Sequence, residues 1–372
     1  MPASSATGVF IGGILRLLEE AEGLEVRTRW LRARPSGGGG RREMIDGSRW
    51  MGREIARLLR DRSHYLIFIY PQLPLLAHVE DPALLAAARR VYQALRARCR
   101  LTRQRIIVLV EHLPIEQARG REIAGGPAAR IDEKRVRAIE STLFRGAYRL
   151  IAPEGLAEAL ASRYRVPARR LRTFRRNIYL TGVAAAQDPP LEFDSGTVNF
   201  FYSGSVDPHI APNFREMLRA IRNAPDTRLH VCGPGRDAVR EWLAELDVPN
   251  VRHHGRLGVA EHDWLAGRCD IGLILYPTDN PYYHLIPTMK YSAYLANGLA
   301  VLSTDLRRVA ENIRADGVGQ AMPIRELAME LLRWATRPNL WIAAKENAEA
   351  RADVIRSGAE LRPFIEELAR GR

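Results

Sequence analysis

Short apolar runs alternate with amphipathic segments along most of the chain. In the second half, runs rich in β-branched and aromatic residues recur at steady intervals, and patterns with a helical period separate them. After the first run, for example, Phe214, Leu218 and Ile221 fall on one face of a helix. The strands expected in this half cover residues 197–203, 228–232, 250–254, 270–276 and 299–304. This alternation predicts a parallel sheet with crossover helices.

The first half repeats the pattern. Strands are expected there at residues 24–31, 64–70, 105–111, 148–152 and 171–175. A stretch rich in Pro, Gly and acidic residues separates the two halves, and such a composition is typical of a linker. The sequence therefore predicts an α/β protein with two Rossmann-like domains. The expected divisions are residues 1–182, a linker at 183–196, a second domain at 197–340 and terminal helices at 341–372.

The chain has no apolar run before its first predicted helix. A buried strand normally precedes that helix in such a fold, yet the first nine residues, MPASSATGV, do not read as one. Either the true start of the protein lies upstream of Met1, or the first sheet lacks its first strand. We expect the former, and a native mass that matches a start at Met1 would contradict it.

The composition is that of an ordinary globular protein of 372 residues, with 46% apolar and 27% charged residues. No run approaches the roughly 18 uncharged apolar residues of a membrane span, and the N-terminal apolar stretch is interrupted by Arg16 and lacks a basic leader, so we expect a cytoplasmic protein. Cys99, Cys232 and Cys269 lie far apart without a C-x-x-C pair. This spacing predicts buried thiols and suggests neither a disulfide framework nor a metal site.

The net charge of +13 belongs to the first half of the chain. Residues 1–200 hold 34 Lys and Arg against 21 Asp and Glu, whereas residues 201–372 hold 22 of each. A basic surface can attract an anionic membrane, a nucleic acid or a phosphorylated acceptor, and solvated arginine-rich helices are the plainer interpretation. Aromatic and basic residues do not interleave as in proteins that bind single-stranded nucleic acid, which argues against a nucleic-acid partner.

Candidate chemistry gathers after the predicted strands of the second half. In an open parallel sheet, ligands bind beyond the C-terminal ends of the strands. Glycines follow three of these strands and could admit a phosphate, and a polar, aromatic loop that could hold a sugar follows the fourth. The glycine-containing turns hold Gly204 with Ser205, Gly233 with Gly235, and Gly255, and the loop holds Tyr276, Asp279, Tyr282, Tyr283 and His284. Singly, these signals also fit tight turns and aromatic packing.

Lys290 is one of three lysines in a chain with 53 arginines. It stands where a helix should begin, after Pro287 and Thr288. A cation in that place opposes the positive end of the helix dipole, so its position calls for an explanation.

These segments together resemble the nucleotide-sugar domain of the GT-B glycosyltransferases. The matching segments are YSGS, HVCGPG, VRHHG, CDIGLILYP and KYSAYLANGLAV, which fall within residues 197–305. The arrangement is similar to bacterial exopolysaccharide and lipid-linked-oligosaccharide transferases, including xanthan-glucuronosyltransferase-like enzymes. The resemblance implies the GT-B fold, in which two Rossmann-like domains with parallel sheets face each other across a cleft and the C-terminal helices return toward the N-terminal domain.

The resemblance also implies a role for Lys290 at the donor diphosphate. A diphosphate between the helix N-terminus and the ammonium would relieve their repulsion, and a fixed cation would stabilise the charge that the leaving diphosphate gains. A solvated surface lysine is the alternative. The residues expected at the diphosphate are Lys290, Gly204, Ser205, Thr288, Met289, Gly12 and Gly13. Those expected at the nucleoside or sugar are Gly233, Gly235, Gly255, Tyr276, Asp279, Tyr282, Tyr283 and His284.

The expected catalytic residues come from the first half of the chain. Many retaining members of the family carry a glutamate where this chain has Ala293, so the resemblance slightly favours inversion of the anomeric centre. An inverting enzyme needs a general base, and the strand at 105–111 ends at Glu111 and His112, where related transferases place an acid or a histidine. We favour His112 as the base, with Glu111 as its orienting partner or its rival. A structural role for both is the alternative.

The hypothesis from the sequence is therefore a transferase that moves a sugar from a nucleoside-diphosphate donor, with uridine as the expected base, to a carbohydrate or lipid-linked acceptor. No cofactor or metal is expected, and peripheral contact with an anionic membrane is a further hypothesis. A nucleotide-sugar epimerase, which would release sugar without an acceptor, is the nearest alternative. Ala293 also leaves room for a non-catalytic nucleotide-sugar-binding homologue.

Overall fold

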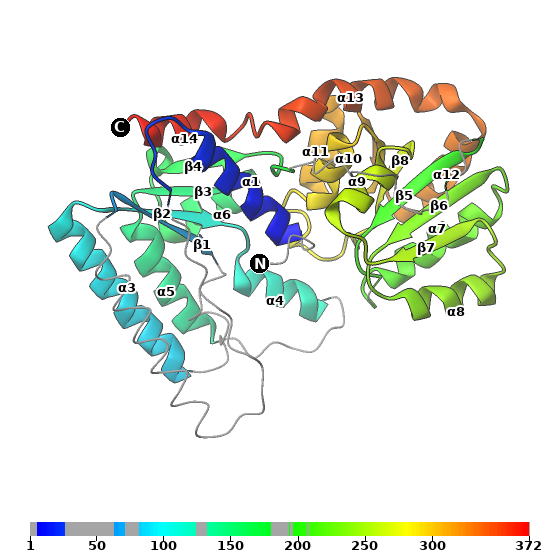
Figure 1. Cartoon of the computed structure of the whole chain (residues 1–372). Coiled ribbons are helices and arrows are strands. Elements are labelled where there is room, and N and C mark those ends of the chain that lie inside the picture. The colour runs from blue at the N-terminus through cyan, green and yellow to red at the C-terminus, as the bar shows by residue number, and fades with distance from the viewer. Residues whose placement is uncertain are drawn as a thin grey trace. The chain divides into compact units, whose positions relative to one another are not determined.

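The computed structural model describes residues 6–26, 63–70, 82–123, 132–179, 193, 196–206 and 208–371. The chain divides into two compact units, each with its own parallel sheet (Figure 1). The larger unit comprises Arg175–Arg372 with Met1–Val26 and Ile123–Gly126, and the smaller unit comprises Arg27–Glu122 and Pro127–Phe174. Two parallel sheets with helices between the strands confirm the predicted α/β class. No helix in the described ranges is long and apolar enough to cross a bilayer.

The larger unit is built on a six-stranded sheet in the order β10-β9-β8-β5-β6-β7. Its strands are β5 (Val198–Ser203), β6 (Thr227–Cys232), β7 (Val251–Gly255), β8 (Ile271–Ile274), β9 (Ala300–Thr304) and β10 (Gly319–Met322). The first five confirm the strands predicted from the apolar runs. Because β5 lies between β6 and β8, the chain reverses its direction across the sheet there, and ligands of open α/β sheets bind beyond the C-terminal ends of strands at such a point.

Helices cover both faces of this sheet (Figure 1). Phe200 and Tyr202 point to one face of β5 and Phe201 points to the other, because side chains alternate along a strand. The first face carries α7 (Ala211–Arg222), α8 (Arg236–Leu246) and α12 (Ile324–Thr336). The second carries α9 (Val259–Ala266), α10 (Met289–Ala296), α11 (Arg307–Asp316) and α13 (Ile342–Arg356). The apolar face predicted for α7 is buried, with Phe214, Leu218 and Ile221 at 0% exposure.

The edge strand β10 was not expected from the sequence. Its four residues, GQAM, include no β-branched or aromatic side chain, so the local pattern carries no strand signal. Gly319 pairs with Val301 of β9 at a φ of 156°, and a Cβ atom there would overlap the Val301 carbonyl oxygen. Pairing with β9, and not local preference, makes this segment a strand.

The smaller unit has a four-stranded sheet in chain order. Its strands are β1 (Tyr65–Tyr70), β2 (Arg105–Val110), β3 (Arg149–Pro153) and β4 (Leu171–Phe174), and its helices are α3 (Pro82–Thr102), α4 (Pro114–Ile123), α5 (Glu133–Gly146), α6 (Glu154–Tyr164) and the 3₁₀ turn η1 (Ala168–Arg170). These four strands confirm the later predictions for the first half. Of the strand expected at 24–31, residues 24–26 belong to no helix or strand, and the rest lies outside the described residues.

The N-terminal helix belongs to the larger unit. This helix, α1 (Ala6–Glu20), contacts α14 (Arg362–Ala369), and Glu20 accepts a hydrogen bond from Arg362 at 3.2 Å (Figure 1). The helices expected at residues 341–372 are α13 and α14, with the 3₁₀ turn η2 (Pro338–Leu340) before them. Residues 1–5, where a preceding strand was sought, lie outside the described part of the chain.

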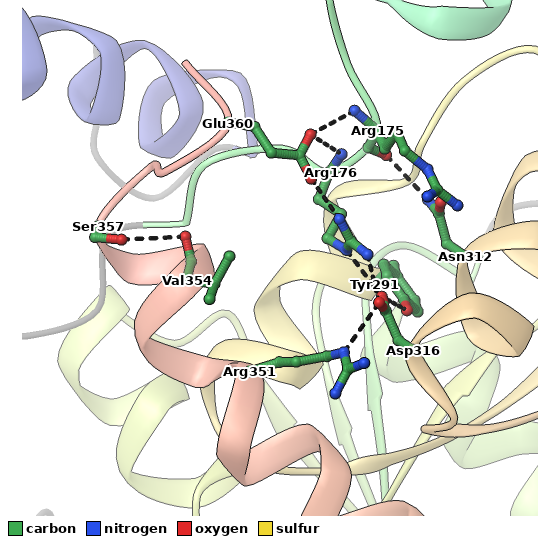
Figure 2. Close-up of polar contacts among 9 residues, drawn as sticks. All are labelled: Arg175, Arg176, Tyr291, Asn312, Asp316, Arg351, Val354, Ser357 and Glu360. Carbon is green, nitrogen blue, oxygen red and sulfur yellow. Dashed lines mark hydrogen bonds and ion pairs between the residues drawn. The ribbon is translucent and has the colours of Figure 1, made fainter. Parts of the chain in front are cut away.

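A group of charges around the buried Asp316, the Asp316 cluster, ties together the larger unit (Figure 2). Arg176 binds both oxygens of Asp316 and one oxygen of Glu360. Tyr291 of α10 donates to Asp316 at 2.6 Å, and Arg351 of α13 donates to it at 3.0 Å. Burial alone would raise the pKa of Asp316, but these donors outweigh burial and the pKa lies below its ordinary value. The cluster is defined as Arg176, Tyr291, Asp316, Arg351 and Glu360.

The same cluster anchors the segment that enters the larger unit. Glu360 accepts the backbone N–H groups of Arg175 and Arg176, at 2.6 and 3.2 Å, and Asn312 donates to the Arg175 carbonyl at 2.9 Å (Figure 2). Because Tyr291 is the third residue of α10, the cluster also fixes the start of the helix that carries Lys290.

Candidate functional site

The turn after β5 leaves space for the ammonium of Lys290. Gly204 has a φ of 143° and donates its N–H to the Cys232 carbonyl at 2.8 Å. A Cβ atom at Gly204 would lie 2.6 Å from Lys290 Nζ, so the ammonium rests directly against this glycine. A Cβ atom at Gly233 would overlap the Gly204 carbonyl oxygen. Both positions therefore require glycine, one for a side-chain contact and the other for the backbone.

Lys290 is half-buried and has no carboxylate partner among the described residues. Its Nζ donates to the Tyr276 hydroxyl at 2.8 Å, and it lies 4.3 Å from the centre of the Tyr276 ring and 5.5 Å from that of Tyr202. A lysine ammonium has three protons to donate. Partial burial of a cation with one neutral acceptor is unfavourable, and an anion in this place would relieve the cost.

Thr288 and Met289 form the start of α10. Thr288 is the N-cap, 5% exposed, and its hydroxyl accepts the N–H of Lys290 at 3.3 Å. Met289 is the first helical residue. Asn177 donates to the Pro287 carbonyl at 2.9 Å and holds the preceding residue. The helix N-terminus therefore lies beside the Lys290 ammonium, and the two together form a positive region.

The predicted glycines after β6 and β7 continue the same edge of the sheet. Gly233 donates its N–H to the Gly255 carbonyl at 2.8 Å, so the turns after β5, β6 and β7 are linked by backbone hydrogen bonds. Gly235 is the N-cap of α8, with a φ of 96°, and Gly255 has a φ of 76°. Ser205 is exposed, and its carbonyl accepts the Tyr202 hydroxyl at 2.9 Å. The structure thus brings Gly204, Ser205, Gly233 and Gly255 to one edge.

The loop after β8 places two of its predicted aromatic residues beside Lys290. Tyr283 stacks on Tyr276, with ring centres 4.5 Å apart and an interplanar angle of 28°. The Lys290 ammonium lies over the Tyr276 ring of this stacked pair. Tyr282 is buried at 4% exposure, which points to packing, and Asp279 is exposed. Tyr276 and Tyr283 are therefore the loop residues best placed for a ligand bound near the ammonium.

His284 has two backbone contacts that explain its place in the loop. Its Nδ1 accepts the N–H of Arg307 at 3.1 Å, so Nε2 carries the proton and donates to the Thr278 carbonyl at 2.8 Å. These bonds tie the loop to the start of α11. A sugar contact for His284 stays a prediction.

One polar group beside the turn was not expected from the sequence. We call Tyr179, Ser203, His262 and Asp263 the His262 network. Ser203 Oγ lies 2.9 Å from His262 Nε2, and His262 Nδ1 lies 3.2 Å from both Asp263 Oδ1 and the Tyr179 hydroxyl. Ser203 could have been noticed as the residue before Gly204, but no motif marks His262, which lies in the middle of α9.

The candidate base residues follow β2 in the smaller unit. Glu111 donates its N–H to the Tyr70 carbonyl at 2.9 Å. Its Oε1 lies 3.7 Å from His112 Nε2, and the side chains are 11% and 27% exposed. The two side chains therefore lie close to each other directly after the C-terminal end of β2. Their catalytic roles stay predictions.

The expected contact of Gly12 and Gly13 with the donor diphosphate stays a prediction. The structure places both residues inside α1, which begins at Ala6. Glycine costs a helix interior about 1 kcal/mol relative to alanine, but Ile11, Ile14 and Leu17 supply a buried face that maintains the helix. A Cβ atom at Gly12 would meet nothing within 4 Å, so no close contact with described residues explains the glycine.

Two of the arginines are bound to carboxylates of the protein, unlike the arginines of a free basic patch. Arg176 is bound in the Asp316 cluster, and Arg119 makes two hydrogen bonds of 2.9 Å to Glu133. The three cysteines are free and buried, as predicted. Within the described ranges, no group of three or more His, Cys, Asp and Glu side chains could hold a metal ion.

Comparison with known proteins identifies the fold. No protein-family model matches the sequence, and no curated protein matches it. Among solved structures, the chain is similar to sucrose-phosphate synthase from Thermosynechococcus elongatus, with a TM-score of 0.63 and 14% identity over 92% of this chain and 82% of that one. It is also similar to WaaG, a glycosyltransferase involved in lipopolysaccharide biosynthesis, with a TM-score of 0.53 and 15% identity over 83% of this chain and 94% of that one.

A third similar structure is HepE from Anabaena in complex with UDP, with a TM-score of 0.54 and 11% identity over 78% of this chain and 82% of that one. Together these structures show that the protein has the GT-B fold, which confirms the fold that the sequence motifs predicted. The identities are too low to assign a substrate.

Proposed function

We propose that the protein is a glycosyltransferase that moves a sugar from a nucleoside-diphosphate donor to a carbohydrate or lipid-linked acceptor. The observation that carries this proposal is the Lys290 ammonium, half-buried against Gly204 at the start of α10 and without a described carboxylate. Three proteins of the same fold support the class, since their names describe a synthase of a sugar phosphate, a lipopolysaccharide glycosyltransferase and a UDP-binding protein. The last of these also supports uridine as the base of the donor.

In this proposal, the diphosphate lies between the Gly204 turn and the N-terminus of α10. The bond that breaks leaves negative charge on the departing diphosphate, so a cation fixed beside it stabilises the transition state more than the bound donor. Thr288 fixes the direction of the helix start, and the Tyr276 hydroxyl fixes the ammonium. The stacked rings of Tyr276 and Tyr283 are the proposed contact for the base or the sugar.

We propose His112 as the general base, with Glu111 as its orienting partner. A histidine titrates near neutral pH and can accept the proton of an acceptor hydroxyl. Ala293 is 5% exposed in the core of the larger unit and offers no carboxylate, which supports an inverting reaction. With the donor bound, His112→Ala should lower kcat by about 10²- to 10⁴-fold. An unchanged pH–rate profile would remove His112 from the mechanism.

The experiment that tests the proposal is a thermal-shift comparison with UDP, other nucleoside diphosphates and their sugar derivatives. A ligand at 100 times its Kd stabilises a folded protein by about 2.7 kcal/mol, so a bound donor gives a clear rise in Tm. Lys290→Met should lose that rise, because it removes the charge and keeps most of the side-chain stem.

Lys134→Met is the matched control. Lys134 is exposed on α5 of the smaller unit, so its loss removes the same charge from the protein without touching the Gly204 turn. A Lys290→Met variant that keeps the rise in Tm would refute the diphosphate role. Turnover without an acceptor would favour the epimerase, and binding without any turnover would favour the non-catalytic homologue.

A further inference from the structure

The His262 network ends at the proposed diphosphate turn. Ser203 is the last residue of β5 and directly precedes Gly204, against which the Lys290 ammonium rests. The hydroxyl of Ser203 belongs to a half-buried residue and reaches His262 Nε2 at 2.9 Å. The His262 imidazole therefore shares a hydrogen bond with Ser203, the residue next to the turn where the diphosphate is proposed to bind.

The protons of the network can be assigned from its acceptors. Tyr179 donates its hydroxyl proton to Asp263 Oδ1 at 2.8 Å. His262 Nδ1 then faces a phenol oxygen and a carboxylate oxygen, both acceptors, so the neutral imidazole carries its proton on Nδ1. Nε2 is left as an acceptor and takes the Ser203 proton. In this state, Ser203 has no proton to offer an incoming phosphate.

The carboxylate of Asp263 is partly buried and has no Lys or Arg partner among the described residues. Its side chain is 13% exposed, and Oδ2 is buried without a hydrogen-bond partner. Besides the network, Asn297 at the end of α10 donates to Oδ1 at 3.2 Å, and no described Lys or Arg forms an ion pair with Asp263. Partial burial of a carboxylate without a counter-charge is unfavourable. An imidazolium at His262 would supply that charge.

The remaining side-chain contacts of His262 are with aromatic rings. Phe201 of β5 packs on the imidazole edge to face, with ring centres 5.1 Å apart, and the Tyr179 ring lies 6.3 Å away. The described polar partners of the His262 side chain are thus Ser203, Tyr179 and Asp263, and Asp263 is the one that carries a charge.

We propose that Ser203 donates a hydrogen bond to the donor diphosphate and that His262 takes up one proton from solvent as the diphosphate binds. This inference rests on the proposed function, because it places a diphosphate at the Gly204 turn. The incoming proton forms an N–H bond at Nε2, Nε2–H then donates to Ser203 Oγ, and the Ser203 hydroxyl turns its own proton to a phosphate oxygen. His262 is a positioning residue that acts through Ser203, and its new charge is balanced by Asp263.

Calorimetric titration with UDP tests the inference. Titrations near neutral pH in two buffers with different ionisation enthalpies give the number of protons taken up per UDP bound. Wild type should take up more protons per UDP than Ser203→Ala and His262→Gln, with a difference approaching one, and Ser203→Ala should bind UDP about tenfold more weakly, as for a lost hydrogen bond to a charged group. The terminal phosphate of UDP has its own ionisation, and the contribution of the free ligand is common to all variants and cancels in the comparison.

Two variants and a control separate the outcomes. His64→Gln removes an exposed histidine of the smaller unit and should behave as wild type. Ser203→Ala deletes a single oxygen, so it decides the matter even where His262→Gln does not fold. Wild-type affinity and proton uptake in Ser203→Ala would overturn the inference and leave the proposed function intact. A wild-type protein that binds neither UDP nor another nucleoside diphosphate would overturn both.

Discussion

Arg176 and Lys290 are two cations of the larger unit with opposite surroundings. Arg176 binds two carboxylates, from Asp316 and Glu360, and its side chain is 15% exposed. Lys290 is half-buried with the Tyr276 hydroxyl as its hydrogen-bond acceptor and no described carboxylate. The two sites meet at α10, because Tyr291, which binds Asp316, is the residue after Lys290.

The difference separates a cation whose charge the protein compensates from one whose charge the proposed diphosphate would compensate. Burial would lower the pKa of Arg176, but Asp316 and Glu360 reverse that effect and raise the pKa, so its charge is compensated within the protein. The charge of Lys290 is not compensated by described residues, and it also faces the positive end of α10. An anion from outside would complete the Lys290 site, whereas the Arg176 site is complete already.

The largest expected effect comes from removing the central carboxylate of the Asp316 cluster. Asp316→Ala removes the carboxylate that binds Arg176, Arg351 and Tyr291, and it leaves a mostly buried guanidinium short of its partner. Breaking one side of a buried ion pair typically costs about 3–5 kcal/mol. We expect a loss of this size in the free energy of unfolding, measured by urea denaturation.

Asp353→Ala is the matched control for this change. Asp353 also lies on a helix, α13, and pairs with Arg356 at 3.6 Å, but its side chain is 96% exposed. Exposed ion pairs contribute little, so the variant should unfold near the wild-type urea concentration. Equal losses for the two variants would show that the Asp316 cluster has no special structural role.

The Asp316 cluster also shows why the sequence alone does not reveal the partners of an arginine. Arg176 stands in an arginine-rich stretch that resembles a basic surface, but its partners Asp316 and Glu360 lie 140 and 184 residues away along the chain. Only the fold brings them together. The strands with continuous apolar runs could be predicted, because a strand that is buried on both faces has apolar residues at almost every position. The strand β10 could not, since its neighbour β9 defines it.

The candidate site likewise contains residues that local sequence features predict and residues that only the fold brings together. Lys290 and Gly204 could be predicted as a site, because a glycine after a strand and a cation at a helix start are local features, although their direct contact needed the fold. The His262 network could not be predicted, because it joins α9 to β5 and to Tyr179 by packing across the sheet. Gly12 and Gly13 show the converse, since two glycines disfavour a helix locally and the packing of α1 maintains one there.

A smaller effect is expected from moving the Lys290 ammonium without removing it. In Gly204→Ala, the new methyl group would meet Lys290 Nζ at 2.6 Å, and the flexible side chain can move away, while the φ of 143° adds about 1–3 kcal/mol of backbone strain. We expect a folded protein with weaker UDP binding by calorimetry, close to that of Lys290→Met. Gly233→Ala gives the contrast, because its methyl group meets the Gly204 backbone, which cannot move away. A Gly204→Ala variant with wild-type affinity would show that the position of the ammonium does not matter.

The smallest expected effect is that of Lys290→Met on the free protein. Loss of the charge removes a repulsion of about 0.3–1 kcal/mol with the helix dipole and an attraction of about 0.5–1 kcal/mol to the Tyr276 ring. These contributions have opposite signs and similar sizes, so the free energy of unfolding in urea should stay within about 1 kcal/mol of wild type. A loss as large as that expected for Asp316→Ala would mean that Lys290 holds the fold together, as Arg176 does, and the distinction between the two cations would fail.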